Sequence, residues 1–175
     1  TTERRWREDL DLAHAIADQV DPVTRAHFER QDFEVQTKPD LTPVTDADRQ
    51  AERMIRESLS RARARDCVLG EEFGQTGRSP RQWVIDPIDG TKNFVRGVPV
   101  WATLIGLIED GQCVVGLVSA PALGRRWWAV SGGGAWTGRS LSSARRMSVS
   151  GVDDLTRASM SYSSLSGWAQ AKRLR

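Results

Sequence analysis

Acidic residues follow a short apolar run in the middle of the chain. Asp86 and Asp89 come after Trp83–Ile85, with a proline between them and Gly90 immediately behind. Because the proline fixes the turn, these two carboxylates can converge on one small volume. Hard divalent cations such as Mg²⁺ are bound by carboxylate, carbonyl and water oxygens, usually with one or two carboxylates per ion. Asp86 and Asp89 therefore predict a magnesium site.

Further groups can complete such a site. The carbonyl of Ile88 is a candidate ligand, and Glu71 and Glu72 close the preceding apolar segment and can add a carboxylate. Gly90-Thr91 then begins a predicted helix, whose free backbone N–H groups can bind phosphate, and the glycine lets the anion approach closely. The Thr91 hydroxyl can hold an attacking water. Phosphoryl transfer requires cations beside an anion site, because positioning and charge neutralisation lower its barrier.

Simpler interpretations exist for each piece. Asp-Pro and Asp-Gly are turn formers, and Glu-Glu is common in solvated loops. Two acidic strand ends combined with a Gly-Thr helix start are hard to obtain from turn chemistry alone, so the combination favours the site. A second glycine-rich segment, Gly133–Ser140, differs from a P-loop because Arg139 stands where lysine is required. No apolar helical pattern follows it, and we interpret it as a glycine-rich turn.

Two helices are predicted upstream of these residues. Apolar residues recur at helical spacing over 6–20, and Pro22 is expected to kink or interrupt this helix. Lys38–Thr45 contains two prolines and is predicted to be an irregular loop. A second helix follows, with Thr45 and Asp48 as a capping box. Its buried face is predicted to comprise Ala51, Met54, Ile55 and Leu59.

After the second helix the pattern becomes that of strands. Cys67–Leu69 and Trp83–Ile85 are short apolar runs that end in acidic residues. Val100–Ile108 and Gln112–Val118 are joined across an Asp-Gly dipeptide, which is a strong hairpin signal. Trp127–Val130 adds a third strand to this meander. The pattern indicates an α+β fold in which two helices precede a mostly antiparallel sheet.

The last part of the chain begins a different pattern. Met147–Val149 and Ala158–Tyr162 look like the opening strands of a further unit. We therefore predict that residues 1–146 form the helix pair and sheet that carry the metal and phosphate site, and that 147–175 begin an incomplete C-terminal α/β half. Residue 1 is Thr rather than Met, so we expect the sequence to be part of a longer protein.

Composition narrows the class of protein. The chain has 175 residues, of which 39% are hydrophobic and 27% charged, as is ordinary for a globular protein. A net charge of +2 does not favour nucleic-acid binding, and arginine runs such as Arg61–Arg65 are interpreted as solvated surface. The uncharged runs are too short to cross a bilayer and no signal peptide opens the chain. We predict a cytoplasmic protein without membrane association, whose Cys67 and Cys113 are reduced thiols.

The segment Trp83–Phe94 closely resembles the first signature of the inositol monophosphatase family. Gly70-Glu71-Glu72 precedes it at the family's usual distance, and Lys38–Asp46 resembles the family's upstream segment. The resemblance extends over most of the chain. It implies a layered α-β-α-β-α fold, dependence on Mg²⁺, a small phosphorylated substrate and a homodimer.

The resemblance also implies roles for individual residues. The implied metal ligands are Glu71, Asp86, Asp89 and the main-chain carbonyl of Ile88. The implied catalytic residues are Asp46, Glu71 and Thr91, of which Asp46 and Thr91 orient and activate the nucleophilic water. The implied substrate-binding residues are Glu71, Ile88, Asp89, Gly90 and Thr91, and backbone amides among them hold the phosphate. The implied reaction is in-line attack by a metal-activated water, without a phosphoenzyme.

Three segments indicate a branch of the family. Arg96–Trp101, Ser119–Trp128 and Ser161–Trp168 are similar to the histidinol-phosphate phosphatases of actinobacteria, which implies hydrolysis of L-histidinol phosphate in histidine biosynthesis. An inositol-1-monophosphatase, or another small phosphate monoesterase of the family, is the alternative. The family's second signature, a Trp-Asp dipeptide that supplies a ligand of the second metal, does not occur in this sequence. A non-catalytic metal-binding fragment is therefore a further alternative.

Overall fold

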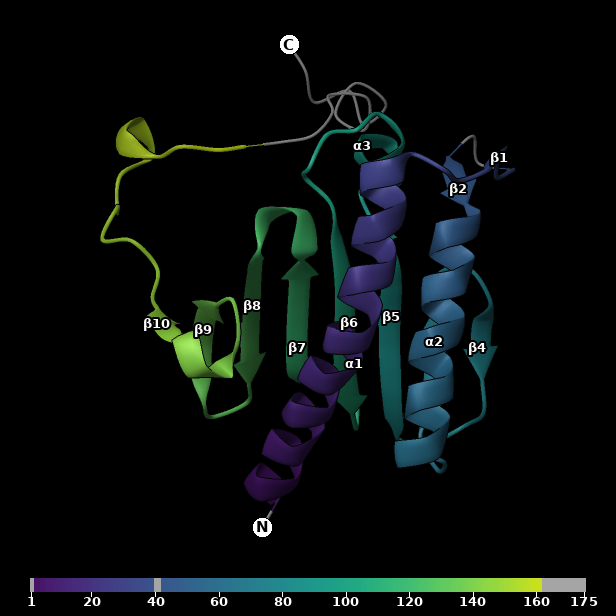
Figure 1. The fold of residues 1–175 in the computed structure, drawn as a ribbon. Coiled ribbons are helices and arrows are strands. Elements are labelled where there is room, and N and C mark those ends of the chain that lie inside the picture. Colours follow the sequence, from purple (N-terminus) through teal and green to yellow (C-terminus); the bar gives the residue numbers. More distant parts are fainter. Residues whose placement is uncertain (1, 40–41, 162–175) are drawn as a thin grey trace.

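The computed structural model describes residues 2–39 and 42–161 (Figure 1). Its main helices are α1 (Thr2–Arg30) and α2 (Asp46–Ala62), and the short helix α3 (Thr91–Val95) follows the central strand. The strands are β1 (Val35–Thr37), β2 (Pro43–Thr45), β3 (Cys67–Gly70), β4 (Gly74–Thr76), β5 (Arg81–Asp89), β6 (Ala102–Glu109), β7 (Gln112–Ala120), β8 (Arg125–Val130), β9 (Gly134–Gly138) and β10 (Arg145–Met147). Single 3₁₀ turns are formed by Pro121–Leu123, Leu141–Ser143 and Leu155–Arg157.

Eight of the strands form one sheet, in the order β10-β9-β8-β7-β6-β5-β3-β4. Only β3 and β5 pair in parallel, and all other neighbours in this sheet are antiparallel. Figure 1 shows α1 and α2 side by side across one face of the sheet. The predicted α+β arrangement of a helix pair followed by a mostly antiparallel sheet is confirmed.

Helix α1 runs without interruption through Pro22. The predicted interruption is wrong, because packing on both sides of the proline outweighs the roughly 3 kcal/mol that it costs in a helix interior, and the alternative of a kink stays a prediction. Val20 before it and Thr24 after it are both fully buried, at 1% and 0% exposure. The Thr24 hydroxyl donates to the carbonyls of Val20 and Asp21, at 3.2 and 3.3 Å, which ties the two sides together.

Helix α2 begins with the predicted capping box. The Thr45 hydroxyl accepts from the Asp48 amide at 3.3 Å, and Asp48 Oδ2 accepts from the Thr45 amide at 2.8 Å. On the predicted apolar face, Ala51, Ile55 and Leu59 are buried, while Met54 is partly buried. Its start and its buried face were thus predictable from local sequence.

The predicted irregular loop over Lys38–Thr45 is partly wrong. Its last residues form β2, which pairs antiparallel with β1 so that Val35 lies opposite Thr45 and Thr37 opposite Pro43. Proline is tolerated there because it is the first residue of its strand, where its missing N–H leaves no ladder bond inside the strand unmade.

The predicted meander is confirmed. Strands β6 and β7 form a hairpin whose turn residues Asp110 and Gly111 both have positive φ, 51° and 79°, as a type I′ turn requires. Strand β8 then pairs with β7. The segment Gly133–Ser140 is not only a turn, since most of it forms β9 against the open edge of β8. Only a single 3₁₀ turn, Leu141–Ser143, follows it and no α-helix starts there, so the P-loop interpretation is also excluded.

Towards the end of the described chain, one predicted strand forms and the other does not. Residues 145–147 form β10 against β9, but Val149 is 95% exposed and lies outside the sheet. Residues 158–161 form no strand, and Tyr162 is outside the described residues. The boundary predicted between 1–146 and 147–175 stays a prediction.

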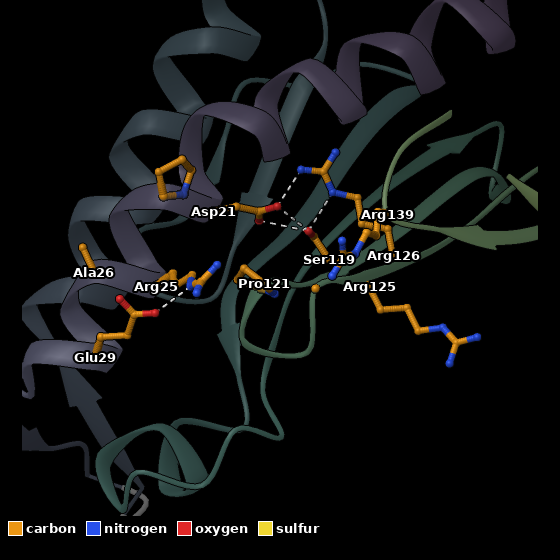
Figure 2. Close-up of a pocket in the computed structure, with 11 residues that line it drawn as sticks. Asp21, Arg25, Ala26, Glu29, Ser119, Pro121, Arg125, Arg126 and Arg139 are labelled. Atoms are coloured by element: carbon orange, nitrogen blue, oxygen red, sulfur yellow. Dashed lines mark hydrogen bonds and ion pairs between the residues drawn. The ribbon is translucent and has the colours of Figure 1, made fainter. Parts of the chain in front are cut away.

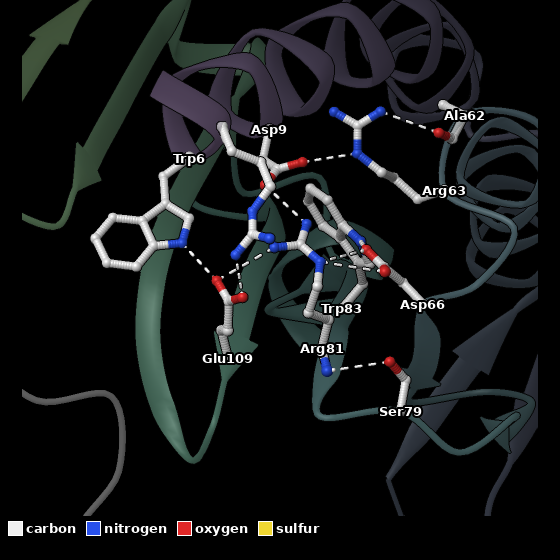
Figure 3. Close-up of polar contacts among 10 residues, drawn as sticks. Trp6, Asp9, Ala62, Arg63, Asp66, Ser79, Arg81, Trp83 and Glu109 are labelled. Atoms are coloured by element: carbon white, nitrogen blue, oxygen red, sulfur yellow. Dashed lines mark hydrogen bonds and ion pairs between the residues drawn. The ribbon is translucent and has the colours of Figure 1, made fainter. Parts of the chain in front are cut away.

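Charged side chains fasten the end of the sheet opposite the site (Figure 3). Asp9 of α1 is fully buried and accepts from Arg63 Nε at 2.7 Å and from Arg81 Nη2 at 2.8 Å. Arg81 also contacts Asp66 and Glu109, each at 3.2 Å. Because these residues come from α1, the end of α2, β5 and β6, the network fixes both helices against the strand that carries the site.

Two further observations concern the described residues as a whole. No helix among them is long and apolar enough to cross a membrane. Cys67 is buried, Cys113 is exposed, and both are free cysteines.

Candidate active site

The C-terminal end of β5 leads into the candidate site. The pairing of β5 with β6 shifts in register between Asp86 and Asp89, so the strand leaves the regular ladder where its carboxylates lie. Gly90 then adopts φ 90° and caps α3. A Cβ at this position would lie 3.1 Å from the carbonyl oxygen of Val100, so both the backbone conformation and the close approach require glycine.

A cavity of about 430 Å³ opens at this strand end. Its lining includes Glu71, Asp86, Ile88, Asp89, Gly90 and Thr91. The structure therefore gathers every residue predicted to bind metal or phosphate around one space, although they come from the β3–β4 turn, β5 and α3. Asp46 does not line this cavity.

Asp86 lacks a counter-charge. Its Oδ1 is buried and has no hydrogen-bond partner. Burial, and then the neighbouring charges of Glu71 and Asp89, raise the pKa of this carboxyl to about 8. A buried, unpaired carboxylate costs several kcal/mol unless a proton or a cation compensates it. The donor set of carboxylate oxygens with a nearby carbonyl suits a hard divalent cation such as Mg²⁺, so the residues fit the predicted metal.

Glu71 is held by an internal cation. Lys38 Nζ donates to Glu71 Oε1 at 2.7 Å and to Glu72 Oε1 at 2.6 Å. Burial disfavours the charged amine, but these bonds outweigh it and hold the pKa of Lys38 above its usual value. Within residues 2–39 and 42–161, no three acidic, histidine or cysteine side chains converge closely enough to form a ready-made metal site. Glu71 must therefore exchange Lys38 for the metal if it is to be a ligand.

The residue beside Thr91 is Asp48 rather than Asp46. Thr91 Oγ1 lies 3.3 Å from Asp48 Oδ1 and 3.0 Å from the carbonyl oxygen of Ile88. Asp46 is exposed, and its Oδ1 accepts from the Glu34 amide at 3.0 Å. The structure thus places Asp48 and not Asp46 against Thr91, because residues two apart in a helix point to different sides, and the role predicted for Asp46 stays a prediction.

Asp48 occupies a buried, polar position. Its carboxyl also accepts from the Thr45 amide, and burial raises the pKa of this group. Sequence reasoning assigned Asp48 only a capping role. The signal that could have identified it is its spacing: Asp48 and Glu52 lie one helical turn apart, on the same side of α2 as the apolar residues Ala51 and Ile55.

A second cavity, of about 590 Å³, lies between α1 and the β7–β8 connection (Figure 2). Arginines dominate its lining, and its acidic groups are already paired. Arg126 contacts Asp21 and Ser119, and Arg25 contacts Glu29 at 2.7 Å. This cavity has no pair of free carboxylates, so it does not offer the chemistry found at the end of β5.

The chain belongs to the inositol monophosphatase family, whose family model matches residues 5–174. It is 64% identical to a histidinol-phosphatase of Streptomyces coelicolor over 97% of this chain and 65% of that protein. It is 59% identical to a histidinol-phosphatase of Mycobacterium tuberculosis over 93% of this chain and 63% of that protein. The chain thus spans less than two thirds of the length of these relatives.

Solved structures support the fold. An extragenic suppressor protein suhB from Bartonella henselae superposes with a TM-score of 0.76 at 30% identity, over 83% of this chain and 55% of that one. An inositol monophosphatase from Thermotoga maritima superposes with a TM-score of 0.74 at 33% identity, over 82% and 54%. The described residues correspond to about half of each protein.

Proposed function

We propose that the protein containing this chain is a Mg²⁺-dependent phosphate-monoester hydrolase that converts L-histidinol phosphate and water into L-histidinol and phosphate. The observation that carries the reaction class is the Asp86 carboxyl, whose buried Oδ1 has no hydrogen-bond partner, beside Glu71, Asp89 and Thr91. The similarity to two histidinol-phosphatases supports the substrate. Family membership supports the reaction class independently of those two relatives.

In this proposal Glu71, Asp86, Asp89 and the Ile88 carbonyl hold the metal. A bound divalent cation supplies the positive charge that neutralises a phosphate group in the cavity. The Ile88 oxygen already accepts from Thr91, but a carbonyl oxygen has a second lone pair and remains available as a ligand. Glu71 becomes available when Lys38 releases it.

In this proposal Thr91 and Asp48 orient and activate the attacking water. The single hydroxyl hydrogen of Thr91 is shared between Asp48 Oδ1 and the Ile88 carbonyl oxygen. Because that hydrogen is directed at Asp48 and Ile88, the lone pairs of Thr91 Oγ1 can accept a hydrogen bond from a water in the cavity and thereby orient it. Asp48 Oδ1 is the acceptor towards which the proton then moves, by way of the Thr91 hydroxyl.

The phosphate is placed by α3 and the cation together. The amides of Asp89, Gly90 and Thr91 are the proposed donors to its oxygens, and the positive φ of Gly90 is what turns the backbone there. Since α3 has only five residues, its dipole contributes little, and most of the affinity for phosphate must come from the cation.

The test is phosphate release from L-histidinol phosphate and from myo-inositol 1-phosphate, with and without Mg²⁺, by the chain and by the full product of its gene. We expect the full product to prefer histidinol phosphate and to require Mg²⁺, and Asp86→Asn to abolish turnover. Full activity of Asp86→Asn would overturn the metal assignment. Equal rates on both substrates would overturn the substrate assignment, and relatives named inositol-1-monophosphatase make that a real alternative.

A homodimer and a cytoplasmic location are further parts of this proposal, and family membership is what supports them. Light scattering of the full product measures its oligomeric state directly. For the 175-residue chain itself, which lacks a Trp-Asp dipeptide, we expect little or no turnover. Rates equal to those of the full product would contradict this expectation.

A further inference from the structure

The turn that carries Glu71 is held by side chains of helix α2. Residues 71–73 connect β3 to β4 and form no strand or helix of their own. Glu52, from the middle of α2, reaches this turn: its Oε2 accepts from the Glu72 amide at 2.7 Å and its Oε1 from the Phe73 amide at 3.1 Å. The Glu52 side chain is fully buried, at 0% exposure. One carboxylate therefore satisfies two consecutive backbone donors of the turn.

Arg56, one helical turn further along α2, completes the attachment. Its Nε donates to Glu52 Oε1 at 2.8 Å, and its Nη1 donates to the Thr76 hydroxyl at 3.0 Å. Its Nη2 donates to the Gly74 carbonyl. Glu52 and Arg56 thus bind the turn and the strand after it, and each compensates the buried charge of the other.

Gly70 shows how closely Glu52 approaches. A Cβ at position 70 would lie 2.1 Å from Glu52 Oε1 and 2.5 Å from Glu52 Cδ, which no real contact allows. Gly70 has no left-handed backbone to explain it, since its φ is not positive. The glycine before Glu71-Glu72 is therefore required by the carboxylate that passes over it.

We propose that Glu52 is a positioning residue for the metal site: it holds the 71–73 turn so that the Glu71 carboxylate faces Asp86. This inference rests on the proposed function, because it assumes that Glu71 is a metal ligand. Glu52 does not line the cavity itself. It acts through the backbone amides of the two residues that follow Glu71, as outer partners of metal ligands do when they fix ligand geometry.

The alternative is that Glu52 and Arg56 are only a buried ion pair that stabilises α2. Both readings predict a less stable variant when Glu52 is changed. They differ in the metal affinity, because only a positioning role makes metal binding depend on the 71–73 turn; hydrogen exchange at the Glu72 and Phe73 amides reports whether the turn has been released. The experiment therefore measures these two quantities in variants matched for stability.

The test variant is Glu52→Gln, which keeps the side-chain volume but replaces one acceptor oxygen with a donor. Mg²⁺ and Mn²⁺ dissociation constants are measured by isothermal titration calorimetry. Metal-free amide exchange at Glu72 and Phe73 is measured by NMR. Glu57→Gln, an exposed change on the same helix, controls for net charge. Ile55→Val, in the core beside Glu52, controls for lost stability.

We expect Glu52→Gln to raise the Mg²⁺ and Mn²⁺ dissociation constants by roughly tenfold or more. Both control variants are expected to stay within about twofold of the unchanged chain. Exchange at the Glu72 and Phe73 amides is expected to accelerate at least about tenfold in Glu52→Gln alone, because each loses a charged acceptor. Gly70→Ala is the second variant, for use if Glu52→Gln does not fold. Its new methyl group displaces the Glu52 carboxylate, and the same two changes are expected.

The outcomes separate the two proposals. If Asp86→Asn loses metal binding while Glu52→Gln binds like Ile55→Val, the metal site stands and the positioning role of Glu52 is overturned. If the unchanged chain binds neither Mg²⁺ nor Mn²⁺, the metal assignment fails and the inference falls with it. Unchanged exchange at Glu72 and Phe73 in Glu52→Gln also overturns the inference, whatever the metal affinity.

Discussion

Asp46 and Asp48 both lie in the first turn of α2, yet only one of them faces the site. Asp48 is 2% exposed and contacts the Thr91 hydroxyl, whereas Asp46 is exposed and contacts the Glu34 backbone. We predict that Asp48→Asn lowers kcat of the active protein by roughly 10²- to 10⁴-fold, the usual contribution of a general base. Asp46→Asn is expected to change kcat by less than about threefold. Steady-state kinetics of the two matched variants decides between these residues.

The unfolding free energy of the two variants has to be measured as a control for that kinetic comparison. Asp48 also belongs to the capping box, so Asp48→Asn is expected to cost about 1 kcal/mol of unfolding free energy. That loss is too small to unfold the protein or to explain a hundredfold loss of rate. If Asp46→Asn instead abolished turnover and Asp48→Asn did not, the role assigned to the Thr91–Asp48 pair would be wrong.

The raised pKa of Asp86 gives a pH dependence with a definite sign. In the metal-free folded chain this pKa is raised from 3.8 to about 8, chiefly by burial. Between these two pH values the folded state keeps a proton that the unfolded state has released, so this group's contribution to stability decreases as pH rises from about 4 to 8. We predict that the melting temperature in EDTA, relative to that of Asp86→Asn, falls across this range.

Magnesium should reverse this dependence, because a cation can replace the proton on Asp86. Saturating Mg²⁺ is therefore expected to raise the melting temperature most near pH 8, where the proton no longer competes. Thermal melts at several pH values, with EDTA or MgCl₂, measure both effects. A difference between wild type and Asp86→Asn that grows with pH in favour of the wild type, in EDTA, would contradict the assignment.

Lys38 competes with the metal for Glu71. Its ammonium group is bound to both Glu71 and Glu72, so a divalent cation has to displace it. We predict that Lys38→Met, which keeps most of the stem but removes the charge, tightens Mg²⁺ binding roughly fivefold, the equivalent of ~1 kcal/mol for a partly exposed pair. Lys92→Met, at an exposed lysine of the same cavity, controls for net charge. Weaker Mg²⁺ binding in Lys38→Met would show that Lys38 supports the site instead.

At the scale of elements, local sequence signals predicted those elements whose stabilising contacts are local in the sequence. The Thr45–Asp48 capping box and the apolar spacing located α2, and the Asp-Gly turn located the β6–β7 hairpin. The wrong predictions share one cause, which is contact between residues far apart in the sequence. Pro22 stays inside a helix because both of its neighbouring turns are buried, and β9 forms because β8 presents an open edge. Neither partner can be identified from a local stretch of sequence.

The candidate site shows the same division. Most of the residues that line it follow one another along β5 and α3, and Glu71 comes from the β3–β4 turn. Their sequence motifs were sufficient to predict that they meet around one cavity, while their roles stay predictions. The residues that support it, Asp48, Glu52 and Lys38, come from α2 and the β1–β2 connection. Their roles depend on how α2 packs against the strand ends, which the helical pattern does not specify.

The ion-pair network around Arg81 joins α1 and α2 to β5. Asp9 is fully buried, and Arg81 provides one of its two cationic partners. We predict that Arg81→Met lowers the unfolding free energy by about 3 to 5 kcal/mol, because it leaves buried carboxylates under-compensated. Urea denaturation measures the loss. Arg4→Met, which removes an exposed pair with Glu8, is expected to cost less than about 0.5 kcal/mol.

The same variant tests how far the network acts. Arg81 begins β5 and the site lies at the other end of that strand. We therefore expect the Mg²⁺ dissociation constant of folded Arg81→Met to stay within about twofold of the unchanged chain. A large loss of metal affinity with intact folding would show that the network also positions the site.

At the scale of the whole molecule, the described helices cover one face of the sheet and leave the other face open. Both α1 and α2 lie on the same side, and no other described helix crosses the opposite side (Figure 1). A row of residues on that opposite side is nevertheless apolar. Leu104 pairs with Val118, and Val118 pairs with Trp127, in a line that starts at Asp86. Each of the three is only partly buried. Strands that are apolar on both faces are normally covered on both.

We therefore predict that the 175-residue chain self-associates through this open face. A contiguous apolar patch on a soluble domain drives association, because burying it removes apolar area from water at about 25 cal/mol per Å². Light scattering should show oligomers whose fraction grows with concentration, and the dye ANS should bind with enhanced fluorescence. Val118→Lys, at the centre of the row, is expected to reduce both signals, while Val149→Lys, at an exposed apolar residue outside the sheet, is expected to leave them unchanged. A monomeric chain that does not bind ANS would show that this face is stable in water as it stands.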